Sequence, residues 1–445
     1  MKEDEAAPLP EDFDAAAYLE RYPDVAASSF GTLAGAAVHF RQFGRAEGRW
    51  ATRASYPTRR ALACPSIHSL YLRATGALVC WDDAGNDTVL QAFDPAVDYA
   101  RDVFLGPVFD RLRHELVAGR LPHPEVCRRC LVLRGGVAHS SFHLDQRVIE
   151  IFQLEPSYKC TLDCPGCVPL ALRRGAPPRE LDLAVVDKIL TDLVAGGVTV
   201  RAFDLQGHGE PLLHPRLGDL VGLLRRHYPE SYVTMTTNAH GVVKEELVRC
   251  GLDEVICSID GIDAPSYEPY RVHGRFALAE SFLAGLCAAK ARAPRPLKVI
   301  WKYILFAHND RPDHLAAAQR RARELGVDEL VFVFTRNGPR SLRLRGPEAL
   351  PAPLPGLAQS HRFHEPDLAD LTGRLEEAER QRENGEAGVA RDLAASVIAN
   401  LDRFGLVVEE AALRSRAASV LRPQGTEQVA PALAPEVSRT VTVTQ

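Results

Sequence analysis

The sequence predicts an α/β fold whose centre is a parallel sheet built from six strand–helix units, between residues 145 and 342. The first indication is that short runs of β-branched and aromatic residues alternate with longer segments of helical periodicity, with little else between them. The second is that such alternation places the strands parallel, joined by right-handed crossovers. Six units fit an open, partial (β/α)6 barrel.

Each expected element follows from its own pattern. The six expected strands are Val148–Leu154, Thr199–Leu205, Tyr232–Thr236, Glu254–Ile259, Leu297–Phe306 and Glu329–Phe334. The expected helices are Leu181–Ala195, Leu213–Tyr228, Gly241–Cys250, Phe276–Ala293 and Arg311–Leu325. In the first helix, Val186, Ile189, Leu190 and Leu193 share one face. In (β/α) barrels the chemistry lies on loops at the C-terminal ends of the strands, so these loops are the first place to search for a site.

The loop after the first strand carries three cysteines, Cys160, Cys164 and Cys167, at C-x-x-x-C-x-x-C spacing. Three thiolates on one short loop can hold three corners of an iron–sulfur cube, whereas a closed site needs a fourth ligand. The next cysteine along the chain is Cys250, far outside the loop. An incomplete ligand set leaves one iron open to a substrate or cofactor.

This loop resembles the signature of the radical S-adenosylmethionine (radical SAM) enzymes. The resemblance implies a 4Fe-4S cluster on Cys160, Cys164 and Cys167, whose open iron is chelated by S-adenosylmethionine. It further implies reductive cleavage to a 5′-deoxyadenosyl radical, which abstracts hydrogen from substrate. Family members often carry an aromatic residue before the last cysteine, near the adenine. This chain has Gly166 there, so the adenine contact must come from elsewhere, such as the backbone or the fifth-strand loop.

Three later strand ends carry further segments similar to those of the family. The second strand ends in Gln206-Gly207-His208-Gly209-Glu210-Pro211, similar to a G-G-E-P segment that contacts the amino group of S-adenosylmethionine. The third and fourth end in T-T-N-A and S-I-D-G, where the family has T-T-N-G and S-x-D-G. Ordinary turns and caps are the alternative. The cofactor-binding residues implied by the resemblance are Gly207, Gly209, Glu210, Pro211, Thr237, Asn238, Ser258 and Asp260.

The last two strand ends supply candidates for substrate or cofactor contacts, although such side chains are often merely solvated. They are Lys302, Tyr303, His308 and Arg336. The remaining cysteines of this region lie at a helix end or in apolar runs, where packed thiols are expected. These are Cys250, Cys257 and Cys287.

Four cysteines precede the barrel and form a second candidate metal site. Cys64 and Cys80 flank an expected hairpin around Thr75-Gly76, and a helix-like stretch from Pro107 to Gly119 leads to Cys127 and Cys130. Four soft ligands suffice for a closed site, and a structural zinc knuckle is one reading. The pattern resembles the SPASM or twitch domain of many radical SAM enzymes, which implies an auxiliary iron–sulfur cluster. That domain usually follows the barrel, whereas here it precedes it.

Composition limits the partners. The chain of 445 residues is 46% hydrophobic, 25% charged and has a formal net charge of -5, values that suit a globular protein and argue against nucleic-acid binding. No apolar segment approaches the ~20 residues of a membrane span, and the N-terminus lacks a signal peptide. A cytoplasmic protein is expected, whose ten cysteines are metal ligands or buried thiols.

The expected organisation places smaller units on both sides of the barrel. The segments are a disordered stretch 1–11, a helical module 12–56, the auxiliary domain 57–140, the barrel 145–342, a proline-rich linker 343–360, a helical hairpin 361–421 and a disordered tail 422–445. The helical module resembles one found in glycosyltransferases and surface-polysaccharide proteins. Its aromatic residues are expected to pack on one another.

Two classes of function remain open. The first is a radical SAM enzyme acting on a peptide, a protein or a carbohydrate-type molecule, with an electron donor such as flavodoxin or ferredoxin. The alternative is a non-catalytic iron–sulfur or zinc protein that uses the barrel as a binding scaffold.

Overall fold

The computed structural model describes most of the chain, and the statements below concern this part. The described residues are 9, 13–44, 49, 64–80, 88–117, 120–127, 147–167, 179–335, 339–341, 343–344, 346–363, 368–385, 387–404 and 408–422. The N- and C-terminal stretches expected to be disordered therefore lie largely outside it, as do Cys130 and Arg336.

A single mixed sheet of ten strands organises the structure, in the order β10-β9-β8-β7-β6-β5-β4-β1-β2-β3. Its strands are β1 (Ser69–Leu72), β2 (Leu78–Val79), β3 (Val89–Gln91), β4 (Val148–Leu154), β5 (Thr199–Leu205), β6 (Tyr232–Thr237), β7 (Glu254–Ser258), β8 (Lys298–Ile304), β9 (Glu329–Phe334) and β10 (Ala358–Phe363). Strands β4 to β10 run parallel to their neighbours. The six predicted strands are all present, and the sheet is open because β3 and β10 are separate edges.

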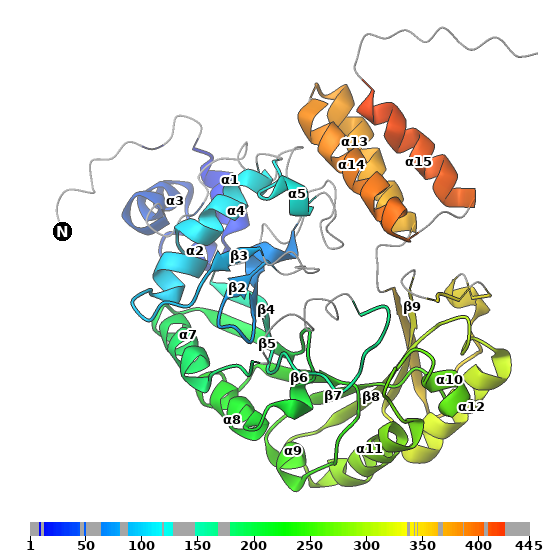
Figure 1. Ribbon diagram of the computed structural model, residues 1–445. Helices are drawn as coiled ribbons and strands as arrows, with labels where there is room; N and C mark the ends of the chain where they lie inside the picture. The colour runs from blue at the N-terminus through cyan, green and yellow to red at the C-terminus, as the bar shows by residue number, and fades with distance from the viewer. Residues whose placement is uncertain are drawn as a thin grey trace, which may run out of the picture.

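The crossover helices lie along the outer side of the curved sheet (Figure 1). They are α7 (Leu183–Ala195), α8 (Leu217–His227), α9 (Glu245–Arg249), α10 (Ala264–Tyr267), α11 (Phe276–Ala289) and α12 (Pro312–Leu325). Short helical turns follow β5 and α11, η6 (Pro211–Leu213) and η7 (Lys290–Arg292). The predicted apolar face of α7 is fully buried, which confirms its orientation against the sheet.

The two faces of the sheet differ in character because side chains alternate along a strand. Phe203 and Leu205 of β5, like Trp301 and Tyr303 of β8, belong to the main apolar core beneath the helices. Their neighbours in the same strands therefore point to the opposite, inner face. Inner-face residues Ile300, Ile304, Val331 and Val333 form a second apolar cluster together with Leu162, Cys164, Tyr270 and Phe306.

The predicted hairpin before the barrel is present, and it extends the barrel sheet. Strand β1 pairs antiparallel with β2 and parallel with β4, so the hairpin continues the same sheet beyond the first barrel strand. Around it lie η3 (Pro65–His68), the π-helical turn η4 (Tyr99–Phe104), α4 (Pro107–Val117) and α5 (Pro124–Cys127). The predicted helix from Pro107 is confirmed as α4.

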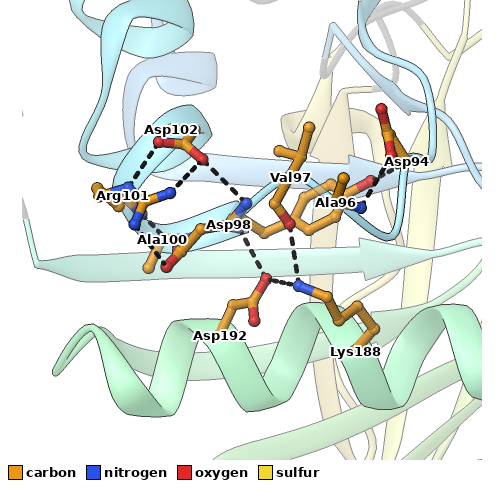
Figure 2. Close-up of polar contacts among 10 residues, drawn as sticks. Asp94, Ala96, Val97, Asp98, Ala100, Arg101, Asp102, Lys188 and Asp192 are labelled. Carbon is orange, nitrogen blue, oxygen red and sulfur yellow. Dashed lines mark hydrogen bonds and ion pairs between the residues drawn. The ribbon is translucent and has the colours of Figure 1, made fainter.

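Helix α7 anchors this N-terminal region to the barrel (Figure 2). Asp192 accepts a hydrogen bond from the backbone N–H of Tyr99 at 2.9 Å, and Lys188 donates one to the carbonyl of Val97 at 2.9 Å. Lys188 and Asp192 also form an ion pair one helical turn apart. One pair of side chains thus fixes the start of η4 on the outer surface of α7.

The first helices form a small unit with its own apolar cluster. They are α1 (Ala15–Arg21), α2 (Pro23–Ala26), α3 (Leu33–His39) and η2 (Phe40–Gly44). Tyr18 is fully buried and lies against Tyr22 and Phe40 at ring-centroid distances of 4.9 Å and 5.7 Å. This confirms the expected packing of aromatic residues.

The region after the barrel contains more structure than the sequence predicts. Strand β10 joins the sheet beside β9, within a segment expected to be linker and helix. A turn η8 (Pro347–Ala349) precedes it, and three helices follow, α13 (Leu368–Glu383), α14 (Ala387–Phe404) and α15 (Val408–Leu421). The break between α13 and α14 falls near Asn384 and Gly385 as predicted, whereas α15 makes a third helix of the expected hairpin. No helix in the described part of the chain is long and apolar enough to cross a membrane.

Candidate active site at the cysteine loop

The three-cysteine loop lies over the inner face of the sheet. Cys164 is buried, and Cys160 and Cys167 are partly buried against the inner-face cluster of β8 and β9 residues. A turn closes the loop, because the N–H of Cys167 donates to the carbonyl of Cys164 at 3.0 Å. The structure therefore brings the three predicted ligands together at the C-terminal ends of the strands.

Several N–H groups point at the cysteine sulfurs. The backbone N–H of Leu162 and the side-chain amide of Asn238 donate to Cys160 Sγ at 3.4 Å and 3.5 Å. Arg271 Nη1 lies 3.8 Å from Cys164 Sγ. Burial raises the pKa of the Cys164 thiol, and the Arg271 cation partly offsets this effect. Donors of this kind stabilise a thiolate, which is the form that binds metal.

These residues fit an iron–sulfur cube better than a single ion. Within the described residues, no three His, Cys, Asp or Glu side chains surround one point at metal-ligand distances. A cube does not need that arrangement, because each thiolate binds a different corner. Three thiols on one loop, with donors aimed at two of them, meet that requirement.

Arg271 reaches the loop from the segment after α10 and is held by a buried carboxylate. Asp260 is fully buried, and its Oδ2 accepts from Arg271 Nε at 2.6 Å while its Oδ1 accepts from the N–H of Ile304 at 2.8 Å. Asn309 donates to the backbone carbonyl of Asp260 at 2.8 Å. Asp260, predicted from the fourth strand end, thus positions a cation beside Cys164. Arg271 has no motif of its own and was not predicted.

Glu210 organises the next loop. Its Oε1 accepts from Thr237 Oγ1 at 2.6 Å and from the N–H of Leu212 at 3.1 Å, while its Oε2 accepts from the N–H of Asn238 at 2.7 Å. Burial raises the pKa of Glu210, and these donors oppose the rise. The carboxylate therefore binds the loop that carries Asn238, in addition to any contact with a ligand.

Substituting Glu210→Gln should loosen this connection, because the new amide would place N–H groups against backbone donors. We expect a loss of about 1–3 kcal/mol in the free energy of unfolding, measured by urea denaturation. The exposed Glu245→Gln substitution at the start of α9 is the matched control and should change little. Equal stability of the two variants would contradict the role assigned to Glu210.

The glycines of the second strand end are required by close packing within the chain. A Cβ on Gly207 would lie 2.5 Å from the side chain of Glu155, and a Cβ on Gly209 would lie 2.0 Å from the carbonyl oxygen of Ser157. The loop therefore rests directly on the segment that leads into Cys160. Pro211 follows as a buried residue of η6.

A buried ion pair connects this loop to the N-terminal hairpin. Glu155, fully buried, accepts from Arg73 Nε and from the N–H of Ala74 at 3.0 Å each, and from the N–H of His208 at 2.6 Å. Arg73 Nη2 also lies 2.7 Å from His208 Nδ1. Since Arg73 directly follows β1, the hairpin and the loop after β5 are held through one carboxylate.

The third strand end carries Ala239 where the similar family segment has glycine, and the backbone of this alanine is strained. Ala239 adopts a left-handed conformation with φ of 63°. Glycine adopts this conformation freely, whereas an L-residue with a Cβ is disfavoured by roughly 1–2 kcal/mol. The backbone still forms the turn, and the N–H of Ala239 donates to Thr237 Oγ1 at 3.0 Å.

The position of Gly166 is filled by an aromatic ring from another segment. A Cβ on Gly166 would lie 2.9 Å from Tyr270 Oη. Tyr270 in turn packs on Phe306, which follows β8, with ring centroids 4.0 Å apart. An aromatic pair therefore stands beside the cysteine loop although the loop itself lacks an aromatic residue.

Three of the four upstream cysteines are described, and they lie near one another. Burial is the main cause that raises the pKa of Cys64 to about 12, and the neighbouring Cys80 and Cys127 raise it further. Ser66 Oγ is 3.6 Å from Cys80 Sγ. Cys130 lies outside the described residues, and the four-cysteine ligand set stays a prediction.

The inner face of the sheet also carries polar side chains, beside the apolar cluster of β8 and β9 residues. Asp204 Oδ2 accepts from Gln206 at 2.6 Å, and Asp204 Oδ1 is buried with no hydrogen-bond partner among the described residues. Burial raises the pKa of Asp204 to about 7, against the opposing charge of Lys302. Burial lowers the pKa of Lys302 to about 8. Ser258 Oγ is a further buried atom without a partner.

The raised pKa of Asp204 predicts a pH dependence of stability. Between its ordinary value of 3.8 and about 7, folded Asp204 keeps a proton that the unfolded chain has released. Stability should therefore fall as pH rises through this range, relative to an Asp204→Asn variant without the titration. The charged groups that act on Asp204 are Lys302, Glu254 and Arg362, and all three remain in the variant.

Urea denaturation of both proteins from pH 5 to pH 8 measures this difference. Asp313→Asn is the control, because Asp313 is exposed and its pKa is lowered mainly by Arg311. The stability of this variant should change with pH as that of the wild type does above pH 5. Parallel curves for wild type and Asp204→Asn would contradict the raised pKa.

Other residues singled out in the sequence, among them Tyr303 and His308, make packing contacts within the protein. Tyr303 is fully buried on the helix side, where its hydroxyl donates to the carbonyl of Asn309 at 2.8 Å. His308 stacks on Phe306 with ring centroids 5.5 Å apart. Cys257 and Cys287 are buried thiols, and Cys250 caps α9, as expected for packed residues.

A cavity of about 800 Å³ lies at the opposite, N-terminal edge of the strands, near Tyr232 and Lys298. Its carboxylates are already paired, since Asp253 binds Arg225 and Arg295 and Asp328 binds Lys290. The cysteine loop, where donors converge on the sulfurs of Cys160 and Cys164, is the better candidate for chemistry.

Comparison with known proteins gives partial matches. No family model matches the chain. The chain is similar to GTP 3′,8-cyclase 2 of Mycobacterium bovis, 33% identical over 159 residues, which are 34% of this chain and 42% of the relative. It is also similar to the PqqA peptide cyclase of Streptomyces rochei, 32% identical over 188 residues, 41% of this chain and 47% of the relative. The chain thus spans less than half the length of these relatives.

Among solved structures, the chain resembles Streptococcus suis SuiB bound to S-adenosylmethionine. The TM-score is 0.34 at 15% sequence identity, covering 73% of this chain and 71% of that one. A likeness of this degree carries no argument about function. The architecture itself is established by the sheet: an open, mainly parallel α/β sheet with a helical C-terminal region.

Proposed function

We propose that this chain, whose curated relatives support a place in the radical SAM superfamily, is an enzyme that cleaves S-adenosylmethionine reductively and abstracts hydrogen from a substrate. The observation that carries the proposal is the cysteine loop, where three thiols lie over the inner face of the sheet with N–H donors aimed at Cys160 and Cys164. A 4Fe-4S cluster held by Cys160, Cys164 and Cys167 would supply one electron and an open iron for the cofactor.

The chain's own residues would orient the cofactor. Arg271, fixed by Asp260, holds positive charge beside Cys164, and Asn238 donates to Cys160. Tyr270 and Phe306 present the aromatic surface next to Gly166 and are the proposed contact for the adenine. Phe306 lies in the fifth-strand loop, which is one of the two sources expected for the adenine contact. The remaining cofactor-side residues of the proposal are Gly207, Gly209, Glu210, Pro211, Thr237 and Ser258.

The upstream cysteines would hold an auxiliary cluster. Cys64, Cys80 and Cys127 lie close enough for their charges to interact, and Cys130 would complete the set. Such a cluster would relay an electron or anchor substrate, with flavodoxin or ferredoxin as the external donor. The proposed substrate is a peptide, as the name of the Streptomyces rochei relative suggests, or a carbohydrate-type molecule.

Anaerobic reconstitution with iron and sulfide tests the proposal. The reduced protein should form methionine and 5′-deoxyadenosine from S-adenosylmethionine, detected by liquid chromatography. Protein that binds iron but yields no 5′-deoxyadenosine would support the alternative of a non-catalytic scaffold. Zinc without iron at both sites would contradict the cluster assignment itself.

A further inference from the structure

The inner face of the sheet is arranged in layers below the cysteine loop. The lowest layer is closed on itself: Lys298 lies 2.6 Å from Glu329 and 3.6 Å from Glu254, and Glu254 also accepts from Thr234 at 3.2 Å. Ser360 donates to Glu329 at 2.5 Å. These groups pair with one another, so they need no ligand. The layer formed by Thr234, Glu254, Lys298, Glu329 and Ser360 is called the polar floor below.

Other polar groups of the inner face differ, because each leaves at least one polar atom without a partner. Asp204 Oδ1 and Ser258 Oγ are buried without a hydrogen bond in the described part of the chain. No hydrogen bond or ion pair joins Lys302 to any described residue, although it lies near enough to Asp204 for their charges to interact. Leaving the two buried atoms, Asp204 Oδ1 and Ser258 Oγ, without a hydrogen bond costs about 1–3 kcal/mol each.

Register places these groups at two levels of the inner face. Asp204 pairs with Thr234 across β5 and β6, level with Glu254 of the polar floor, and Ser258 lies four residues further along β7. Ser258 pairs with Lys302 across β7 and β8, so their side chains are neighbours. Ile300 and Ile304, two residues to either side of Lys302 on the same face, contact the cysteine-loop cluster. Charges of Asp260 and Arg271 above and of Asp204 below all act on Lys302. Asp204 thus lies at the level of the polar floor, and Ser258 and Lys302 lie between it and the proposed cofactor site.

We propose that Asp204, Ser258 and Lys302 form the substrate-recognition site of this enzyme and bind the amino and carboxylate groups of an amino-acid unit. The inference rests on the proposed function and names the substrate class for the same site. The Asp204 carboxylate and the Lys302 ammonium group interact through their charges but form no direct contact. A ligand that carries both a positive and a negative charge can lie between them and pair with each. An ammonium group binds Asp204 and Ser258, and a carboxylate binds Lys302, in charge-assisted hydrogen bonds.

The charge balance argues against a polyanionic substrate. Glu254 and Asp204 interact with each other, and a triphosphate bound by Lys302 would meet the Asp204 carboxylate. Of the cations that act on Lys302, Arg271 is already paired with Asp260, and Arg362 is exposed. A neutral sugar would donate and accept hydrogen bonds but would bring no charge to balance Lys302 or the ionised form of Asp204, whereas an ammonium group favours that ionised form. The amino-acid unit is the class that meets all three groups.

Binding is measured separately from catalysis, by the thermal unfolding midpoint of the reconstituted protein with S-adenosylmethionine present. The probes are the free L-amino acids, the corresponding N-acetyl amino-acid amides, GTP and glucose. Free amino acids that raise the midpoint indicate a small-molecule substrate or a chain terminus. The N-acetyl amino-acid amides lack both charged groups, so a midpoint raised equally by them would contradict recognition through the amino and carboxylate groups.

The substitutions Asp204→Asn and Lys302→Gln should each weaken the binding of the active probe by about tenfold or more, since each removes a charge-assisted hydrogen bond. Asp313→Asn and Lys244→Gln, exposed residues outside the interior, are the matched controls and should bind as the wild type does. Formation of 5′-deoxyadenosine, assayed in parallel, reports separately on the proposed function.

Three results would overturn the inference while leaving the proposed function intact. The first is a midpoint raised by GTP or glucose and by no amino-acid probe. The second is amino-acid binding that persists in both variants. The third is 5′-deoxyadenosine formation without any response to the amino-acid probes.

Discussion

Replacing Cys164 by serine is expected to abolish formation of 5′-deoxyadenosine and to remove the iron held by the cysteine loop. Cys164 is the buried member of the three, and Arg271 Nη1 lies 3.8 Å from its sulfur. A loop with two thiolates leaves two irons of the cube without a protein ligand. Iron content, visible absorption and product formation measure the effect, and Cys160→Ser and Cys167→Ser should behave in the same way.

The control for this prediction is Cys250→Ser. Cys250 is partly buried, caps α9 and donates to the carbonyl of Leu247 at 3.1 Å, so serine can keep this hydrogen bond. It should bind iron and form product as the wild type does. Full product formation by any of the three loop variants would show that the loop does not hold the catalytic cluster. In all three, iron at the upstream cysteines should remain.

The substitution Asp260→Ala is expected to reduce the free energy of unfolding by about 3–5 kcal/mol, because it leaves the Arg271 cation buried without its counter-charge. Asp260 is fully buried and accepts from both Arg271 and the backbone of β8. Urea denaturation measures the loss. The exposed pair of Arg216 and Asp219, 2.7 Å apart, provides the control, and Asp219→Ala should cost about 0–1 kcal/mol.

A double substitution separates charge from packing. Asp260→Asn combined with Arg271→Gln removes both charges and should recover part of the stability lost in Asp260→Ala. Its cofactor site would still lack the cation beside Cys164, so product formation should remain low. If Asp260→Ala and Asp219→Ala lost the same free energy, the ion pair would not stabilise the site.

Much of the barrel could be predicted because its signals are local. β-branched and aromatic runs such as Val148–Leu154 identify strands by themselves, and Asn384-Gly385 identifies the break between α13 and α14. Strand β10 was missed because its sequence, Ala358-Gln359-Ser360-His361-Arg362-Phe363, is polar and follows prolines. It is held by pairing with β9 instead. The parallel pairing of β1 with β4 is likewise a long-range property.

The candidate site likewise contains residues that local motifs predict and residues that only the fold brings there. The cysteine spacing and the motifs at Glu210 and Asp260 are contiguous, so they could be read from the sequence. Arg271 and Tyr270 reach the loop from a segment without a motif, and only the fold places them there. The sequence around Asp204 gives one local signal, a carboxylate between the apolar residues Phe203 and Leu205. This alternation predicts that Asp204 lies on the face of the sheet opposite the apolar core.

The central claim is that the loop of Cys160, Cys164 and Cys167 holds a cluster with one iron open to S-adenosylmethionine. Electron paramagnetic resonance of the reduced, reconstituted protein tests it most directly, with Cys64 and Cys127 replaced by serine so that one cluster remains. Adding S-adenosylmethionine should change the g-values of the cluster signal, because the cofactor binds an iron that lacks a protein ligand. A cluster signal that S-adenosylmethionine leaves unchanged would contradict the account.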